Sequence, residues 1–154
     1  SNENFFISIL NIEREKEKPR KDYAKYSDIY PIISFFYDDV YEAIDKLNLE
    51  WNPAIAKSDI KAVLQDYHDT MDMTLDEENW FNSIKELAVR HGFADNIKVW
   101  KKDKESYKGH VGDVSEFLRI ALSGRRNSPN LYYVIQILGK AKVQQRIETI
   151  LKTL

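Results

Sequence analysis

Cysteine is absent from this chain of 154 residues, which excludes disulfide bonds and zinc sites built on thiolates. Long hydrophobic runs are missing as well, because no apolar stretch approaches the ~20 residues that a membrane-spanning helix needs. No signal-peptide pattern is present. These absences favour a globular cytoplasmic protein with no membrane segment. The chain starts with Ser1-Asn2 instead of Met, so we expect it to be part of a longer protein.

Recognisable catalytic and metal-binding motifs are also missing. There is no P-loop and no GxGxxG motif, and no Ser/His/Asp arrangement stands out. The three histidines, His68, His91 and His110, lack the spacing of zinc ligands. The series Asp66, Asp69 and Asp72 fits a solvated helix face. We therefore expect no cofactor, no metal and no catalytic residue in this chain.

Charge is unevenly distributed along the sequence. Residues 1–97 contain 11 Lys and Arg against 20 Asp and Glu, a net charge of −9, whereas residues 98–154 contain 12 against 5, a net charge of +7. The net charge of the whole chain, −2, is small because these two opposite charges nearly cancel. It favours a C-terminal half that binds a polyanion over chance clustering of solvated charges.

Apolar periodicity indicates an all-α fold without strand alternation or internal repeats. The chain is long enough for one domain or two small helical subdomains. We expect a bundle of about seven helices in two subdomains, residues 1–73 and 74–154. The segment 95–112 has no clean period and could be a loop, a short helix or a small ribbon. The expected helices are approximately 5–18, 27–46, 58–71, 74–91, 114–123, 128–138 and 140–151.

Capping residues suggest where several helices begin and end. Ser58 is an expected N-cap, and the segment from Thr74 to Glu77 has the form of a capping box. Ser128 followed by Pro129 predicts another N-terminus, with a capping hydroxyl before proline at the first helical position. Glycines at the ends of three apolar patterns predict helix stops: Gly92, Gly124 and Gly139.

The C-terminal third contains the residue types that a single-stranded RNA site needs: cations for phosphates, flat faces for bases, and hydrogen-bonding groups for base edges. A helix N-terminus at Ser128 would add N–H groups and a positive dipole end. Each residue also has a structural explanation, because Leu131 suits a core, Ser128 a cap, and Arg125 and Arg126 solvent. Arg119 is unusual, since it lies within an apolar helix. The candidate residues are Arg119, Arg125, Arg126, Ser128, Pro129, Leu131, Tyr132 and Tyr133.

This third resembles the end of bacterial glutamyl-tRNA synthetases, class I enzymes, in the order and spacing of four short motifs over some forty residues. The motifs are Leu118-Arg119-Ile120-Ala121-Leu122-Ser123-Gly124, Ser128-Pro129-Asn130-Leu131, Leu138-Gly139-Lys140 and Arg146-Ile147. A weaker likeness extends over essentially the whole chain, most clearly at Ser34-Phe35-Phe36-Tyr37-Asp38 and Trp80–His91.

The resemblance implies an anticodon-binding domain. In that family the position of Arg119 approaches the middle anticodon base, and the positions of Ser128, Pro129, Leu131 and Tyr132 form a platform for the first and middle bases. This chain departs mildly from the pattern, with Ser123 in place of the usual Thr and Asn130 in place of the usual Gly.

The resemblance also implies partners and cofactors for a longer protein. That protein would attach glutamate to tRNA(Glu) with ATP and Mg²⁺, whereas this part would recognise the anticodon loop as a monomer. The two ATP-binding signatures of class I synthetases are absent here. Two other interpretations remain open: a free-standing helical domain that binds structured RNA without reading an anticodon, and a protein-interaction domain whose acidic half contacts a basic partner.

Overall fold

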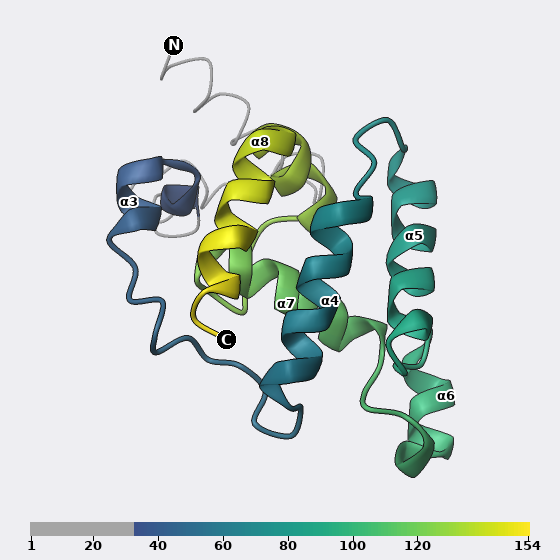
Figure 1. The fold of residues 1–154 in the computed structure, drawn as a ribbon. Coiled ribbons are helices and arrows are strands. Elements are labelled where there is room, and N and C mark those ends of the chain that lie inside the picture. Colours follow the sequence, from purple (N-terminus) through teal and green to yellow (C-terminus); the bar gives the residue numbers. More distant parts are fainter. Residues whose placement is uncertain (1–32) are drawn as a thin grey trace, which may run out of the picture.

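The helix α7 (Val111–Ser123) lies at the centre of the fold in the computed structural model, which describes residues 33–154. Eight of its side chains are buried: Val111, Val114, Phe117, Leu118, Ile120, Ala121, Leu122 and Ser123. Three long helices pack against α7, namely α4 (Lys57–Thr70), α5 (Glu77–Arg90) and α8 (Leu131–Leu151) (Figure 1). Its burial on several sides explains why α7 is the most continuously apolar of the expected helices.

The remaining elements are short. They are η2 (Ser34–Phe36), α3 (Asp38–Glu42), α6 (Ile97–Lys102) and η3 (Lys104–Ser106). Within residues 33–154 there is no strand, only an isolated parallel bridge between Ala94 and His110. The all-α prediction is confirmed, with six α-helices in the described part where about seven were expected for the whole chain. The expected helix 5–18 lies outside the described residues, and the division into subdomains at residue 73 stays a prediction.

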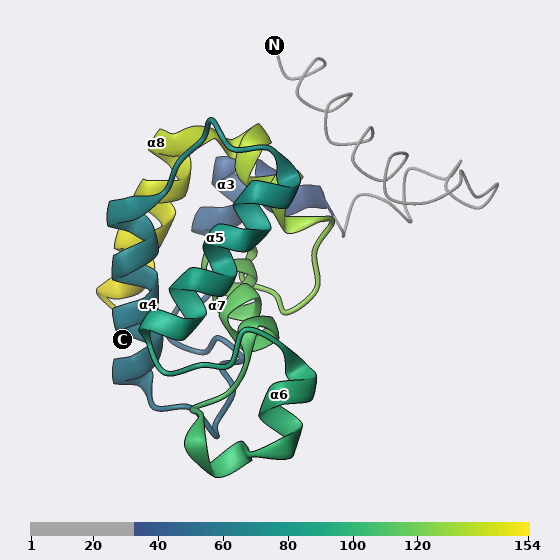
Figure 2. The same ribbon diagram turned by 90° about the vertical axis from the view of Figure 1, so that its right-hand side faces the viewer.

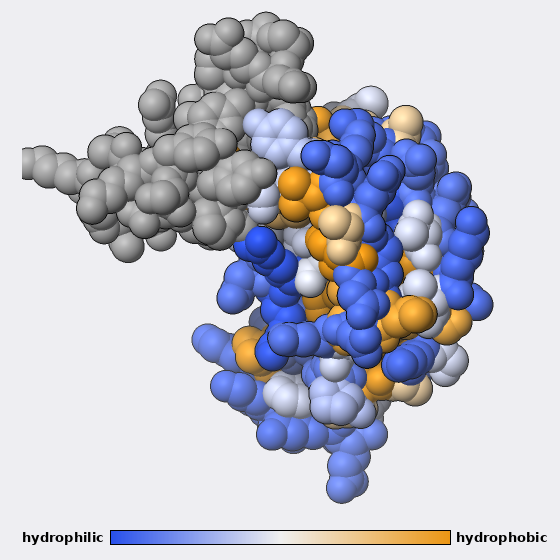
Figure 3. Space-filling view, turned by 90° about the vertical axis from the view of Figure 1, so that its left-hand side faces the viewer, coloured by the Kyte–Doolittle hydropathy of each residue, from blue (hydrophilic) through white to orange (hydrophobic). Residues whose placement is uncertain are grey.

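Helices α4 and α5 are amphipathic, and each buries one stripe of side chains. The buried residues recur at three- and four-residue intervals: Ile60, Val63, Leu64 and Tyr67 on α4, and Trp80, Ile84, Leu87 and Ala88 on α5. The two stripes meet where Trp80 Nε1 donates a hydrogen bond to the Tyr67 hydroxyl at 3.2 Å. On another side of the molecule, which α3 and α8 form, hydrophilic side chains surround a smaller set of hydrophobic ones (Figure 3).

Helix α8 consists of two helical segments that meet at Gly139. This glycine has φ 81° and ψ 160°, a conformation that is essentially restricted to glycine. The expected helix stops at Gly92 and Gly124 also have positive φ, at 82° and 73°. The three predicted glycine stops are therefore confirmed.

The expected helix 27–46 is wrong for residues 33–46. This segment forms η2, the five-residue α3 and a series of turns. Phe35 and Phe36 are both buried and stack with their ring centroids 4.4 Å apart, although neighbours on a regular helix point about 100° apart. The carbonyls of both phenylalanines accept hydrogen bonds from the Arg146 guanidinium, at 2.8 and 3.5 Å. Contacts with a distant residue thus replace helical hydrogen bonds here.

Two predicted N-caps are also wrong. Helix α4 begins one residue earlier than Ser58, after Ala56, whose side chain makes no capping bond. Helix α5 is capped by Asp76, which accepts a 2.8 Å hydrogen bond from the Asn79 amide, whereas the Thr74 hydroxyl donates to Asp72. Asp caps a helix as well as Ser or Thr does, so residue types alone did not decide between the two positions.

The start of α7 lies three residues before the expected Val114. His110 is its N-cap: His110 Nδ1 accepts from the Gly112 amide at 2.9 Å, and the Asp113 carboxylate accepts from the His110 amide at 2.9 Å. Histidine is an uncommon cap, which explains why the sequence pattern did not indicate it.

Candidate nucleic-acid interface

Arg119 and the loop between α7 and α8 form the centre of the candidate site. Arg119 Nη1 donates to the Ser128 hydroxyl at 2.7 Å and to the Pro129 carbonyl at 3.1 Å. Burial lowers the pKa of Arg119, and the nearby Glu116 acts in the opposite direction. Arginine nevertheless remains charged in proteins. Within residues 33–154, its Nε and Nη2 make no hydrogen bond and the guanidinium makes no ion pair. A half-buried cation with unused donors is therefore held beside the loop.

The beginning of the loop is fixed by Ser123 and Gly124. The Ser123 hydroxyl donates to the Arg119 carbonyl at 2.6 Å and accepts from the Arg125 amide at 3.2 Å. Gly124 has φ 73°, and a Cβ atom at this position would lie 2.8 Å from Ile44 Cδ1. The chain therefore turns at a residue that needs both left-handed backbone and the absence of a side chain.

The end of the loop is fixed by Asn130, which is the N-cap of α8. Its side-chain oxygen accepts a 3.0 Å hydrogen bond from the Tyr132 amide, and its Nδ2 donates to Glu77 Oε1 at 3.1 Å. The predicted cap at Ser128 is wrong, because α8 begins at Leu131 and the Ser128 hydroxyl is bonded to Arg119 and to the Pro129 carbonyl. Pro129 is buried in the loop and is not a helical residue.

A pocket of about 190 Å³ lies where α5, α7 and the start of α8 meet. It is lined by Glu77, Trp80, Phe81, Ser115, Arg119, Asn130 and Leu131. Phe81 is 40% exposed, which is unusual for a large aromatic side chain in this fold. The pocket therefore combines a cation, a carboxylate, an amide, a hydroxyl and an accessible aromatic ring. These are the groups that can stack on a base and form hydrogen bonds with its edge.

The two loop arginines lie outside this pocket. Arg125 and Arg126 are both exposed, and Arg126 Nε is 3.6 Å from Glu116 Oε2 on α7. Both side chains are therefore surface cations of the loop and do not line the pocket.

Tyr132 does not line this pocket, and its side chain packs against the core. Its hydroxyl donates to the Leu75 carbonyl at 2.7 Å, and its ring centroid is 5.8 Å from Trp80 and 5.3 Å from Tyr133. It remains partly exposed, so its proposed role as a face for a base stays a prediction.

The structure thus brings together Arg119, Ser128, Pro129 and Leu131 and leaves Tyr132 to one side. Sequence reasoning missed Glu77, Phe81, Ser115 and Asn130. Asn130 could have been found, because it is a strong cap residue directly before the apolar run. The α5 residues could not, because their place at the site depends on the packing of α5 against α7.

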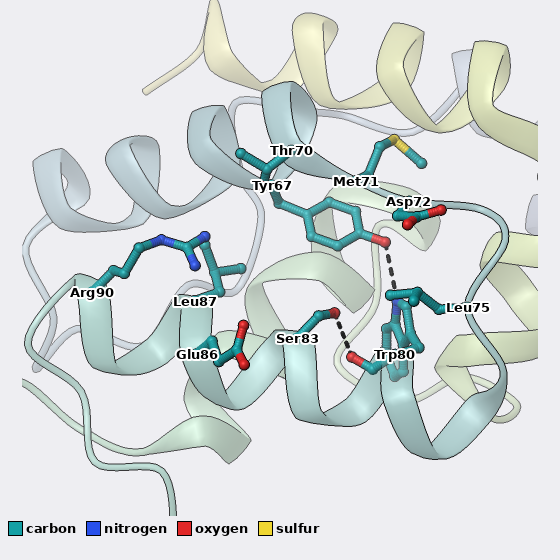
Figure 4. A pocket seen from close by; sticks show the side chains of 10 residues that line it. All are labelled: Tyr67, Thr70, Met71, Asp72, Leu75, Trp80, Ser83, Glu86, Leu87 and Arg90. Atoms are coloured by element: carbon teal, nitrogen blue, oxygen red, sulfur yellow. Dashed lines mark hydrogen bonds between the residues drawn. The ribbon is translucent and has the colours of Figure 1, made fainter.

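A second pocket, of about 250 Å³, lies between α4 and α5 (Figure 4). Tyr67 and Trp80 point toward each other across it, and Glu86 and Arg90 extend from α5 at its rim (Figure 4). Burial raises the pKa of the Tyr67 hydroxyl to about 12, although the hydrogen bond from Trp80 opposes this shift. None of the candidate residues from the sequence lines this pocket.

None of the helices in residues 33–154 combines the length and the apolar character that a membrane-spanning segment requires. No group of three or more His, Cys, Asp or Glu side chains within residues 33–154 is placed to hold a metal ion.

The family model and the curated relatives that match this chain point to the same family. The model of the anticodon binding domain family matches residues 20–151. The glutamate–tRNA ligase of Acetivibrio thermocellus is 39% identical over 145 residues, which cover 94% of this chain and 26% of that protein. The glutamate–tRNA ligase of Sorangium cellulosum is 41% identical over 138 residues, covering 90% and 24%. That of Clostridium perfringens is 35% identical over 147 residues, covering 96% and 27%.

The chain therefore spans about a quarter of the length of these relatives, and the part matched is their C-terminal region. The resemblance that the C-terminal motifs indicated is confirmed over nearly the whole chain.

Proposed function

Because this chain belongs to the anticodon binding domain family, we propose that it binds the anticodon loop of a tRNA as part of a longer glutamate–tRNA ligase. The observation that carries this proposal is Arg119. Its charge is half-buried, has no carboxylate partner within residues 33–154, and borders a pocket with an accessible aromatic ring. Leaving such a charge unpaired is costly, so a ligand oxygen would improve its surroundings.

A splayed base is the ligand that fits this pocket best. Phe81 offers a face for stacking, and Arg119 can donate to a base carbonyl. The Glu77–Asn130 pair, at 3.1 Å, adds an acceptor and a donor to the lining of the same pocket. The loop fixes the position of the Arg119 guanidinium, because Ser128 and Pro129 both accept hydrogen bonds from it. Leu131 supplies an apolar wall of the pocket. Arg125 and Arg126 would hold the phosphates outside.

The activity of the longer protein is part of the same proposal. It would attach glutamate to tRNA(Glu) in the cytoplasm, as a monomer, using ATP and Mg²⁺ in a catalytic domain that this chain does not contain. Residues 33–154 contribute recognition of the tRNA and no catalytic step.

A binding titration with three RNA hairpins tests the proposal: the anticodon stem-loop of tRNA(Glu), the same hairpin with its middle anticodon base changed, and an unrelated tRNA hairpin. The unmodified chain should prefer the first. Arg119→Met should remove most of that preference, about 10- to 100-fold, because one base contact is worth about 1–3 kcal/mol.

The matched control is Arg126→Met, an arginine of the same loop that lies on the surface. It should weaken binding to all three hairpins by a similar factor and leave the preference unchanged, because it would contact phosphate only. If Arg119→Met behaved like this control, the proposed base pocket would be wrong. Equal affinity of the unmodified chain for all three hairpins would instead favour a general RNA-binding domain.

A further inference from the structure

Helix α6 and the turn after it form a basic projection that contributes nothing to the core. None of the six residues of α6 is buried, and Ile97 and Val99 are 44% and 40% exposed. Residues 97–108 contain five lysines against two carboxylates, a net charge of +3. We define this segment, residues 97–108, as the α6 ridge. An ordered excursion that buries no core residue is a candidate for contact with a partner.

The ridge is held rigidly at its base. The Ala94 amide donates to the Gly109 carbonyl and the Lys108 amide to the Gly92 carbonyl, both at 3.0 Å, so the two ends of the excursion are joined. Asn96 caps α6 through hydrogen bonds from the Lys98 and Val99 amides. The position of the ridge relative to α7 is therefore fixed by the backbone.

Trp100, one of the two aromatic residues of the ridge, stiffens it through two ring contacts. The Trp100 ring lies 5.1 Å from the ring of His110, the N-cap of α7, and Lys104 Nζ lies 4.8 Å from the centroid of Trp100. Lys108 is paired with Asp59 at 2.7 Å. By contrast, Lys98, Lys101 and Lys102 are exposed and make no ion pair with any residue of the described part. These three are the cations available to a ligand.

A simpler role for two of these lysines is to stabilise the C-terminal end of the α6 dipole, where Lys101 and Lys102 lie. That role does not account for Lys98, which is in the first turn, where a cation is unfavourable. It also does not account for the exposed Ile97 and Val99 beside it.

The ridge and the candidate base pocket lie at opposite ends of the same two helices. His110 at the start of α7 contacts the ridge, and Gly124 at its other end begins the loop. Glu77 at the start of α5 contacts Asn130, whereas Gly92 after its end joins the base of the ridge. The 13 residues of α7 extend about 20 Å at 1.5 Å per residue. Figure 2 shows α6 and the loop on the same side of the molecule, with α4 on the other side.

We propose that the α6 ridge binds the phosphate backbone of an RNA duplex whose single-stranded loop occupies the Arg119 pocket. This inference rests on the proposed function. A loop held at one end of α7 continues into its own stem, and a rigid row of unpaired lysines at the other end of this helix, which is about 20 Å long, fits the backbone of that stem. Such contacts add affinity without sequence preference.

Two RNAs separate the ridge from the pocket: the anticodon stem-loop, and a single-stranded oligonucleotide with the loop sequence alone. The variant is Lys101→Gln with Lys102→Gln. Its matched control is Lys61→Gln with Lys152→Gln, which removes the same charge from exposed positions on α4 and at the end of α8. All chains are measured over a range of salt concentrations, after circular dichroism melting has shown that they are equally folded.

The ridge variant should bind the stem-loop about tenfold more weakly at ~0.1 M salt, with the slope of log K against log salt shallower by about 1 to 2. Its affinity for the oligonucleotide should equal that of the control.

If the ridge variant bound the stem-loop like the control, the ridge would belong to another partner, such as a protein, and the inference would be overturned while the proposed function stood. Equal weakening of binding to both RNAs would also overturn the inference, because the ridge lysines would then attract any RNA and make no particular contact with the stem. If the unmodified chain bound neither RNA, the proposed function would fail, and this inference with it.

Discussion

Arg146 is the buried charged side chain of residues 33–154, only 4% exposed. Its Nη1 donates to the carbonyls of Phe35 and Leu122, at 2.8 and 2.7 Å, and its Nη2 lies 3.2 Å from Asp38. The guanidinium also stacks over the ring of Tyr41 at 4.1 Å, while burial raises the pKa of the Tyr41 hydroxyl. One cation thus joins three segments that are distant in sequence, and one of them is the last turn of α7 before the loop.

Replacing Arg146 by Met should lower the free energy of unfolding by about 3 kcal/mol, because buried carbonyls lose their donor. Asp38→Asn is the matched control: its carboxylate is largely exposed, so the loss should stay below about 1 kcal/mol. Urea denaturation followed by circular dichroism measures both. Equal losses would show that the ion pair, and not the carbonyl contacts, provides the stabilisation.

Gly124 is a second residue whose identity is set by its surroundings. Gly124→Ala should cost about 3 kcal/mol, since left-handed backbone costs an L-residue about 1–2 kcal/mol and the new methyl group would overlap Ile44. Gly92→Ala, at φ 82°, has the same strain but meets only the flexible Lys108 side chain, at 3.4 Å, and should cost about 1–2 kcal/mol. Adding Ile44→Ala to Gly124→Ala should remove the overlap penalty, as a double-mutant cycle would measure. A coupling energy of zero would contradict this account.

At the level of helices, His68 links α4 to α8. Its Nδ1 and Nε2 are each 2.8 Å from a carboxylate, Asp69 and Glu148 respectively, and these hydrogen bonds raise the pKa of His68. Because the folded-state pKa is raised, the contribution to stability is complete below the ordinary value of about 6.5 and is lost as pH rises through the folded-state pKa. Both carboxylates are exposed, so the contribution should stay below about 1 kcal/mol.

Glu148→Gln should therefore reduce the pH dependence of the urea midpoint as pH rises above 6.5, the ordinary pKa of histidine. The unmodified chain should lose stability over this range, and the variant should lose less, with the two converging at the alkaline end. The same pH dependence in both chains would show that His68 gains nothing from the contact with α8.

The sequence predicted those elements that depend on local patterns. Helices α5, α7 and both segments of α8 were expected from apolar periodicity and glycine stops, and Gly92, Gly124 and Gly139 indeed have positive φ. The segment 33–46 was mispredicted as helix, because its backbone is organised by Arg146, more than a hundred residues away in the chain. Caps were predicted less well, since several residues near each helix start have equivalent capping ability.

The candidate site shows the same division. Arg119 was predicted as a site residue because it is a charge within an apolar helix. The loop was predicted between two helices because Gly124 precedes it and Ser128-Pro129 follows. The pocket itself needs Glu77 and Phe81 from α5, and no sequence pattern brings α5 beside α7. The neighbours Trp80 and Phe81 differ in burial, since Trp80 is buried and Phe81 is exposed. Only the tertiary arrangement decides which of the two aromatic side chains is buried.

In the whole molecule, the positively charged segments of the sequence also lie on one side of it. The basic C-terminal portion supplies both the loop and most of the α6 ridge, and α6 and the loop lie on the same side of the molecule (Figure 2). A chain with a net charge of −2 can therefore still attract a polyanion, because the local field depends on where the charges lie.

Hydrogen exchange should reveal both contact regions at once. With the anticodon stem-loop at about 100 times its Kd, the folded state gains about 2.7 kcal/mol. Amides that exchange by local opening should be protected in residues 124–131 and 97–102, where the loop and α6 would meet RNA. Those in residues 46–56, which lead into α4, should exchange at an unchanged rate. Protection confined to 124–131 would support the pocket and exclude the ridge, whereas protection centred on 46–56 would place the RNA on a different face of the molecule.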